Sequence, residues 1–246
     1  QWFSLTIRWR HSISLKKPVH SGPLNELKII EFEGIGPAPL AGQLLSDLGA
    51  DVIKILRKHT TIKKEPILDR NKKTIPLDLK NTNDKEIVKK LITKADVLIE
   101  GFRPGVMERL GLGPKDCEKI NPKLVFGRIT GWGQDGPYAK KAGHDINYLA
   151  VTGALNAIGF KNSEPIPPLN LLGDYAGGTM FLIMGILSAL WERNTSNKGQ
   201  VVDAAMIEGV PALMSLIHTF IAQDNWNNDR SSNLLDGGCP YYKCYK

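Results

Sequence analysis

The sequence predicts an α/β protein, with a doubly wound, mostly parallel sheet followed by long helices. Between residues 24 and 130, short apolar segments of strand length alternate with segments of helical periodicity. Strands that alternate with helices at these lengths favour a parallel sheet covered by helices on both faces. After Gly131 the pattern changes to long helical segments joined by polar or glycine- and proline-rich links. A chain of 246 residues is long enough to bury a substantial core.

The elements of the first half follow from the apolar runs and from the residues that interrupt them. Pro76 lacks a ladder donor, which favours an edge position for the strand that contains it, and Gly49 ends the first helix. Strands are expected at 27–32, 50–56, 73–79, 95–102 and 124–129, and helices at 40–48 and 86–94.

Two long helices are expected in the second half, over residues 174–193 and 201–223. Pro211 would kink or interrupt the second of them. We expect three parts in the chain: a basic leader at 1–23, a large α/β domain at 24–223, and a linker at 224–246.

The formal net charge of +7 suits an anionic ligand. The basic residues are spread along the chain and are not interleaved with aromatic residues, so no nucleic-acid partner is expected. The longest apolar run, Met180 to Leu190, is too short to cross a bilayer, so no membrane span is expected.

The stretch from Gly143 to Gly178 contains the strongest candidates for chemistry. His144 and Asp174 each follow a glycine and each precede an apolar run with helical spacing. Unpaired N–H groups at a helix start favour negative charge, so such a place suits an anion and a proton shuttle. An Asp before a helix is more often a simple N-cap, and a Gly-His-Asp sequence is often a turn. The pattern alone leaves both interpretations open.

Basic residues follow several predicted strands, where open α/β sheets bind ligands. Arg57 follows the second strand, Lys80 the third, and Arg103 and Arg109 the fourth. Each one alone is better explained as a solvated surface charge, but the set favours a phosphorylated ligand. The first strand–helix junction lacks G-x-G-x-x-G and contains prolines, so NAD binding is not expected.

Several sequence blocks occur together in the order found in a known family. They are Gly49–Val52, Ala95–Pro104, Gly111–Pro114, Gly131–Gln134, Gly143–Tyr148, Gly173–Gly178, Gly199–Asp203 and Leu235–Gly238. On these blocks, residues 24 to 246 resemble the family III CoA-transferase superfamily of the CaiB/BaiF type, and within it the branch of α-methylacyl-CoA racemases.

The resemblance implies that the domain at 24–223 binds coenzyme A (CoA), and that the linker at 224–246 leads into a small C-terminal domain that is largely missing. It also implies an acyl-CoA substrate, an interlocked homodimer, and neither a metal nor a redox cofactor, since CoA is part of the substrate. It also implies that His144 and Asp174 are the two acid/base residues. The backbone N–H of Asp145 is our candidate donor for the enolate oxygen. The CoA contacts carried over from the family are Arg57, Leu77, Asp78, Leu79, Lys80, Arg109, Gly143, His144, Asp145, Ile146, Asn147 and Tyr148.

The reaction implied is the epimerisation of 2-methylacyl-CoA thioesters, in which one group removes the α-proton and another returns a proton on the opposite face. Burial would have to raise the pKa of Asp174 so that it holds a proton. One alternative is a family III CoA-transferase with Asp174 as nucleophile, although its members generally lack a histidine at the position of His144. Another is an inactive CoA-binding fragment.

Both ends of the chain carry further expectations. The leader has four basic residues, several serines and no acidic residue, which resembles a mitochondrial transit peptide, although translated upstream sequence has the same appearance. Members of the family continue beyond the position of Lys246, so we expect the C-terminus to be truncated. We expect a mitochondrial or peroxisomal matrix enzyme of fatty acid or bile acid metabolism, with the acyl-chain preference left open.

Overall fold

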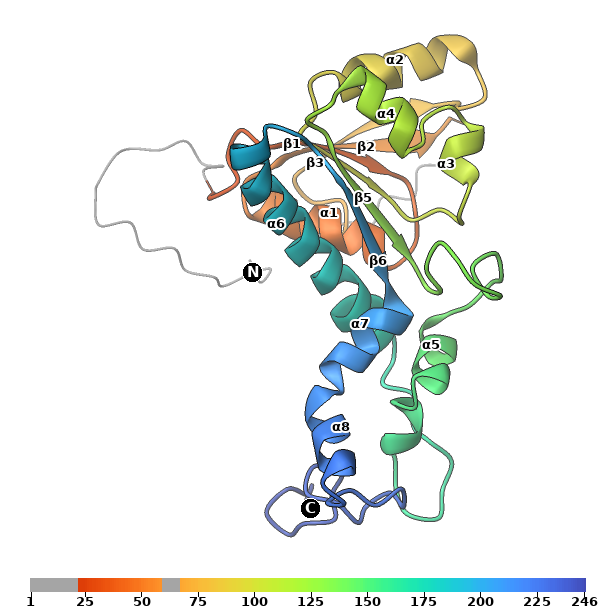
Figure 1. Cartoon of the computed structure of the whole chain (residues 1–246), viewed down its shortest axis with the longest axis vertical. Coiled ribbons are helices and arrows are strands. Elements are labelled where there is room, and N and C mark those ends of the chain that lie inside the picture. Colours follow the sequence, from red (N-terminus) through yellow and green to blue (C-terminus); the bar gives the residue numbers. More distant parts are fainter. Residues whose placement is uncertain (1–21, 59–66) are drawn as a thin grey trace, which may run out of the picture. The chain divides into compact units, whose positions relative to one another are not determined.

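The computed structural model describes residues 22–58 and 67–246, and these form two compact units. Unit 1 contains the chain up to Arg128 together with Leu182–Val202, and unit 2 contains Ile129–Phe181 and Asp203–Lys246. Figure 1 shows the helices and strands of both. The predicted leader lies outside the described residues except for its last two positions. The predicted domain boundary at residues 223–224 stays a prediction.

A single sheet of six strands has the order β3-β2-β1-β4-β5-β6. Its pairings β1–β2, β1–β4, β2–β3 and β4–β5 are parallel, and Figure 1 shows β6 running beside β5 in the same direction. This is the strand order of a doubly wound fold, so the predicted fold class is confirmed. The strands are β1 Lys28–Phe32, β2 Asp51–Arg57, β3 Lys72–Leu77, β4 Val97–Glu100, β5 Val125–Thr130 and β6 Val201–Ala205.

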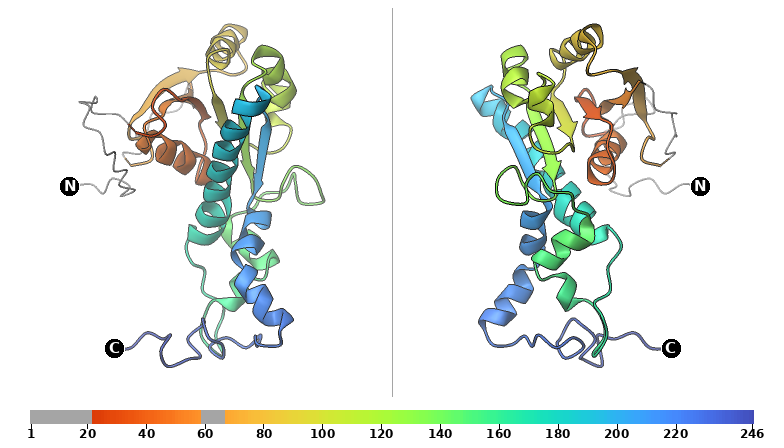
Figure 2. Two further views of the ribbon diagram at one scale, coloured as in Figure 1. Left: turned by 60° about the vertical axis from the view of Figure 1, so that its left-hand side comes forward. Right: turned by 90° about the vertical axis from the view of Figure 1, so that its right-hand side faces the viewer.

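Helices cover both faces of the sheet (Figures 1 and 2). On one face Ile30, Phe32 and Phe126 join a core with Val88 and Met107 from the covering helices. The helices of this face are α2 Thr82–Ile92, α3 Val106–Arg109 and α4 Pro114–Ile120. The opposite face is covered by α1 Pro37–Asp47 and α6 Met180–Ser196. Strand β3, which contains Pro76, lies at the edge of the sheet, as predicted from the missing ladder donor of proline.

Glycines allow the helices of unit 2 to approach closely. A Cβ atom added to Gly209 would lie 1.8 Å from the carbonyl oxygen of Gly177, and one added to Gly178 would lie 3.1 Å from side-chain carbons of Ile129 and Met206. Only glycine at 209 permits this backbone contact. The elements of unit 2 are α5 Asp145–Val151, the 3₁₀-helix η1 Leu155–Ala157, the π-helix η2 Leu171–Thr179, α7 Met206–Leu213 and α8 Ser215–Ala222.

Three predicted elements need correction. The expected helix over 201–223 is wrong at its start, because Val201–Ala205 is the strand β6. Its remainder is two helices, which meet at Met214, three residues after the predicted break at Pro211. The helix expected at 86–94 begins earlier, at Thr82, because the Asn81 side chain accepts hydrogen bonds from the backbone of the first turn. The first helix likewise begins at Pro37, where proline costs no intrahelical bond.

The helical stretch Leu171–Ser196 is long and apolar enough to cross a membrane by length and composition only. Core helices of globular proteins pass the same test, so this finding establishes no membrane span. Part of its apolar character has another cause, because Leu182 and Ile186 pack where a Cβ on Gly127 of β5 would stand. The expectation of no span stays a prediction.

A fully buried ion pair lies between the sheet and α1. Lys72 Nζ donates to Glu31 Oε2 at 2.6 Å and to the carbonyl oxygen of Pro39 at 2.9 Å, and neither charged side chain is exposed. Burial raises the pKa of Glu31 to about 7 and lowers the pKa of Lys72, while their mutual attraction opposes both shifts. Lys54 and Asp69 form a neighbouring pair at 2.7 Å. Glu31 therefore depends on Lys72 to remain charged.

We predict that Lys72→Met lowers the free energy of unfolding by about 3 kcal/mol at pH 8, because it leaves a buried carboxyl without its partner. Without Lys72, the pKa of Glu31 in the folded state rises further above its unfolded value. The loss relative to the parent chain therefore grows as pH rises above about 7, the pKa of Glu31 in the parent, and is smaller at pH 5. Urea unfolding at both pH values measures the effect.

The matched control is Lys73→Met. Lys73 pairs with Asp51 at 2.7 Å, but both side chains are largely exposed, so its removal should cost less than about 1 kcal/mol at either pH. Equal losses for the two variants would contradict the special role of the buried pair. Adding Glu31→Gln to Lys72→Met should recover stability at pH 8.

Candidate active site

One carboxylate connects the two segments that carry the candidate acid/base residues. Asp145 is the first residue of α5 and is 6% exposed. Its Oδ2 accepts hydrogen bonds from the backbone N–H groups of Gly173, at 2.7 Å, and Asp174, at 2.8 Å. The start of α5 and the first turn of η2 are therefore joined by a charge-assisted pair of bonds, which are stronger than bonds between neutral groups.

Gly173 is required for this arrangement. A Cβ atom added there would lie 2.8 Å from Asp145 Oδ2 and 2.9 Å from its Cγ. Any side chain at residue 173 would push the carboxylate away from the two N–H groups that it binds. The space taken by the Asp145 carboxylate therefore explains why a glycine precedes Asp174.

His144 is the N-cap of α5 and is exposed. Its N–H donates to Asn147 Oδ1 at 2.9 Å, and its carbonyl oxygen accepts from Asn147 N–H at 2.8 Å. These reciprocal bonds fix the backbone of His144 at the helix start, as in a capping box. The capping interpretation of the sequence is correct for the backbone, and it leaves the imidazole available for chemistry.

Asp174 is half-buried, and its pKa is raised. Burial is the largest cause, the charge of Asp145 adds to it, and a hydrogen bond from the Asn170 side chain and the nearby His144 oppose it. Asp145 Oδ1 is buried and has no hydrogen-bond partner among the described residues, so the charge of Asp145 is incompletely compensated there. The raised pKa agrees with the requirement that Asp174 hold a proton.

The predicted position of Asp174 ahead of a helix is wrong. Asp174 is the fourth residue of the π-helix η2, which begins at Leu171 and continues into α6 at Met180. π-Helices are rare in proteins, and those that do occur are often found at functional sites. Glycines at 173, 177 and 178 are three of its nine residues, which leaves few side chains to pack against neighbouring turns.

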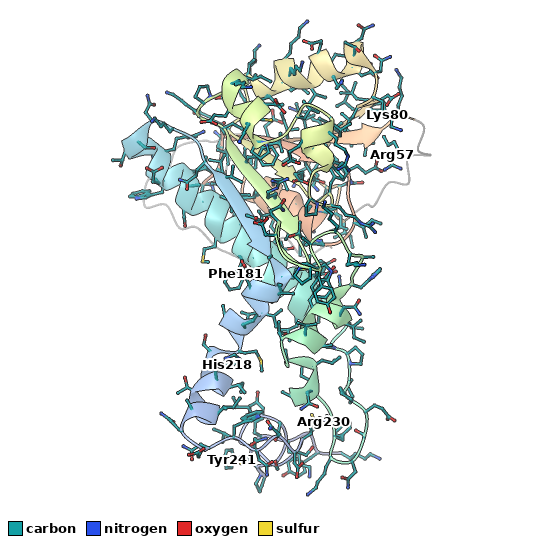
Figure 3. All side chains as sticks on the ribbon, turned by 45° about the vertical axis from the view of Figure 1, so that its right-hand side comes forward. Arg57, Lys80, Phe181, His218, Arg230 and Tyr241 are labelled. Carbon is teal, nitrogen blue, oxygen red and sulfur yellow. The ribbon has the colours of Figure 1, made fainter. Side chains whose placement is uncertain are left out.

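In unit 1, the candidate CoA contacts gather where β2 and β3 end. Arg57 and Leu77 are paired across the two strands, and Figure 3 shows Arg57 and Lys80 at the same end of the sheet. Both cations are exposed. Asp78 and Leu79 form the turn into α2, where Asp84 Oδ2 accepts from the Asp78 N–H at 2.9 Å and Asp78 Oδ1 accepts from the Lys80 N–H at 2.9 Å.

The other predicted cations of unit 1, Arg103 and Arg109, are exposed after β4. A buried arginine that the sequence analysis did not single out lies nearby: Arg128 of β5 pairs with Glu100 at 3.1 Å and with Glu108 at 3.0 Å. Burial raises the pKa of Glu100 to about 7. Arg128 is therefore committed to these carboxylates, and the exposed arginines are the ones accessible to an anion.

In unit 2, the predicted contact segment Gly143–Tyr148 is the start of α5. Ile146 and Asn147 are exposed, whereas Tyr148 is buried at 6% exposure. The described residues contain no group of three or more His, Cys, Asp or Glu side chains that could hold a metal ion. The carboxylate of Asp145 was missed by sequence reasoning, which considered only its backbone. The glycine beside Asp174 was the signal that could have indicated a close neighbour.

Comparison with known proteins finds matches over most of the chain. The sequence pattern of CoA-transferase family III matches residues 24–246. The chain is 43% identical to the alpha-methylacyl-CoA racemase of Mus musculus over 223 residues, which are 91% of this chain and 58% of that protein. It is 34% identical to the formyl-CoA:oxalate CoA-transferase of Escherichia coli over 204 residues, 77% of this chain and 49% of that protein. The crystal structure of a CAIB/BAIF family protein from Brucella suis is similar with a TM-score of 0.76 and 30% identity, over 84% of this chain and 59% of that one.

We predict that Asp145→Asn lowers the pKa of Asp174. Asparagine keeps an oxygen acceptor for the Gly173 and Asp174 N–H groups, but it removes the negative charge that raises this pKa. The protonated form of Asp174 should therefore disappear at lower pH than in the parent chain. An NMR titration of the Asp174 carboxyl carbon measures the change.

Asp135→Asn is the control, since Asp135 is an exposed carboxylate of the same unit. It should leave the Asp174 titration unchanged. An unaltered Asp174 titration in Asp145→Asn would contradict the coupling between the two carboxylates.

Proposed function

The chain belongs to CoA-transferase family III, and on this premise we propose that it carries the acid/base centre of a 2-methylacyl-CoA racemase, an isomerase. The observation that supports this most directly is the joining of His144 and Asp174 through the Asp145 carboxylate, beside an Asp174 whose pKa is raised. A racemase needs two such groups on opposite sides of one carbon. The chain spans 58% of the length of the mouse racemase, so the activity of the whole protein is part of the proposal.

The proposed reaction has two proton transfers and no net change in composition. The His144 imidazole takes the α-proton from one face, and the electron pair of the broken C–H bond moves into the thioester as an enolate. Protonated Asp174 then donates its proton to the opposite face, which forms the other epimer. In the reverse direction the two side chains exchange the roles of acid and base. A raised pKa at Asp174 keeps its proton available at higher pH.

The enolate oxygen requires a hydrogen-bond donor. Asp145 is the first residue of α5, and the first N–H groups of a helix have no acceptor within the helix. The backbone N–H of Asp145 is the candidate, immediately after His144 in the chain. Its side chain holds η2, so one residue would serve both the enolate and the position of Asp174.

Coenzyme A carries phosphates, and the exposed cations at the ends of the strands suit them. We assign Arg57, Lys80 and Arg109 of unit 1 to this role, with the 77–79 segment and the 143–148 segment as further contacts. CoA enters as part of the substrate, and the proposal requires neither a metal nor a redox cofactor.

The rival function is CoA transfer, in which Asp174 would attack the thioester and form a mixed anhydride. The similarity to formyl-CoA:oxalate CoA-transferase favours this alternative. The histidine at 144, at the start of α5, favours the racemase, because a nucleophilic mechanism needs no second base on the other face.

We also propose that the protein forms a homodimer, and that it works in the mitochondrial or peroxisomal matrix. Helix α8 supports the first point, because none of its residues is buried. Leu216 and Ile221 are 52% and 51% exposed, and Leu213 of α7 is 44% exposed. An apolar helix surface of this kind marks an interaction site. The localisation rests only on the composition of the first 23 residues and on the resemblance.

We predict that the protein incorporates deuterium at the α-carbon of a single 2-methylacyl-CoA epimer in heavy water, with loss of stereochemical purity. The assay uses this chain and also the chain with any further residues that its own coding sequence supplies. Mass spectrometry measures exchange, and chiral chromatography measures inversion. An added carboxylic acid should change neither rate.

His144→Ala should lower inversion at least 100-fold, because one of the two proton-transfer groups is lost. His218→Ala is the matched control, since His218 is another exposed histidine of unit 2. Unchanged exchange and inversion in His144→Ala would refute the role of His144. Transfer of CoA to the added acid without α-exchange would instead establish the transferase, with Asp174 as nucleophile.

We predict that Leu216→Lys combined with Ile221→Lys shifts the protein from dimer to monomer, because two charges would enter the apolar surface of α8. Sedimentation velocity measures the mass. Ile35→Lys is the control, since Ile35 is 97% exposed in unit 1 and should leave the mass unchanged. A parent chain that sediments as a monomer at all concentrations would refute this surface as a dimer interface of the described chain.

A further inference from the structure

Two aromatic rings lie against the backbone that carries His144. The Trp132 and Tyr148 rings meet edge to face, with centroids 4.8 Å apart and planes at 83°. The Tyr138 ring also contacts Trp132, with centroids 5.1 Å apart. Edge-to-face pairs are a favourable aromatic geometry. All three residues belong to unit 2, as does His144.

The contact between these rings and the backbone is closer than any side chain would allow. A Cβ atom on Gly143 would lie 2.7 Å from Tyr148 Cε1 and 2.9 Å from both Cζ2 and Nε1 of Trp132. A Cβ atom on Gly131 would lie 2.0 Å from Tyr148 Cζ. Neither glycine has a positive φ, so space and not backbone conformation requires glycine at both positions. The rings occupy the volume that a side chain at 143 would need.

The rings are themselves held by fixed backbone. Gly133 N–H donates to Thr130 Oγ1 at 3.0 Å, and Ile207 N–H donates to the carbonyl oxygen of Gly131 at 3.1 Å. These bonds tie the turn that carries Trp132 to the end of β5 and the start of α7. Tyr148 is one helical turn after His144 in α5. The peptide between Gly143 and His144 is therefore bounded by ring surfaces whose own supports are hydrogen-bonded.

The Trp132 indole contributes by its shape. Its Nε1 atom is buried and has no hydrogen-bond partner within residues 22–58 and 67–246. A ring of similar width without an N–H group should therefore perform the same task. A small side chain should not, because it would leave the Gly143 backbone unsupported.

We propose that Trp132 and Tyr148 are positioning residues that hold the His144 backbone at a fixed distance from the reacting carbon. This inference rests on the proposed function, since it assigns a cause to the position of a base that the proposed reaction uses. The Trp132 ring need touch no substrate to have this effect. Their effect is on the proton transfer of His144 and leaves the Asp174 side of the reaction intact.

The test compares Trp132→Ala, Trp132→Phe and the control Trp191→Ala, whose indole is 81% exposed on α6. In Trp132→Ala, kcat for inversion should fall ~100-fold, the effect of a displacement of about 1 Å at a catalytic group. The KM for the acyl-CoA should stay within about twofold of the parent value. Deuterium exchange should persist for the epimer whose α-proton Asp174 removes. Trp132→Phe should recover most of the activity.

Two further measurements distinguish a failure of the positioning role from a failure of the proposed function. Gly143→Ala should show the same loss of inversion, and that loss should be roughly fivefold smaller when Trp132→Ala is already present, because the colliding indole is gone. The backbone order parameter of His144, measured by NMR without substrate, should fall below about 0.6 in Trp132→Ala and not in Trp191→Ala. An unchanged order parameter, or equal losses of exchange from both epimers, would overturn the positioning role. No exchange in the parent chain would overturn the proposed function, and the order parameter would still decide the inference.

Discussion

The candidate site depends on one hydrogen-bonded carboxylate. Asp145 accepts two N–H groups from the first turn of η2, so the start of α5 and the start of the π-helix are held together by a single side chain. Burial is the largest cause of the raised pKa of Asp174, and the charge of Asp145 adds to it. The position of η2 and part of the pKa shift of Asp174 therefore depend on one carboxylate, and its removal would disturb both at once. Glycine at 173 is the steric condition for this arrangement.

Much of the fold follows from local patterns. The strands from β1 to β5 were predictable because buried apolar runs of strand length alternate with helices, and Pro76 correctly indicated an edge. Strand β6 was missed because Val201 and Asp203 are exposed and the run of five residues continues into a helix without a break. The short helices α3 and α4 carry too few turns for a periodic signal. A π-helix differs from an α-helix in its hydrogen bonds, which apolar spacing does not reveal.

The site was predictable in part. His144 and Asp174 were identified by their positions beside glycines, and the structure brings them under one another's electrostatic influence. The Asp145 carboxylate and the aromatic pair Trp132–Tyr148 were not found, since both act through contacts between segments distant in sequence. Glycines at 131, 143 and 173 were visible in the sequence, and each records the close approach of a side chain from elsewhere. None of these three glycines has a positive φ, so at each of them a close neighbour and not the backbone conformation requires glycine.

The buried pair between Glu31 and Lys72 has a consequence for how the sheet forms. The burial pattern of strand β3 specifies its register only weakly, because exposed and half-buried residues do not alternate regularly along this edge strand. A slip by two residues in one direction would bring Thr74 to the place of Lys72. That misalignment would replace the ammonium partner of the buried Glu31 by a neutral hydroxyl group. The buried pair therefore favours the native register of β3 over this slip, in a strand whose other side chains discriminate weakly between the two.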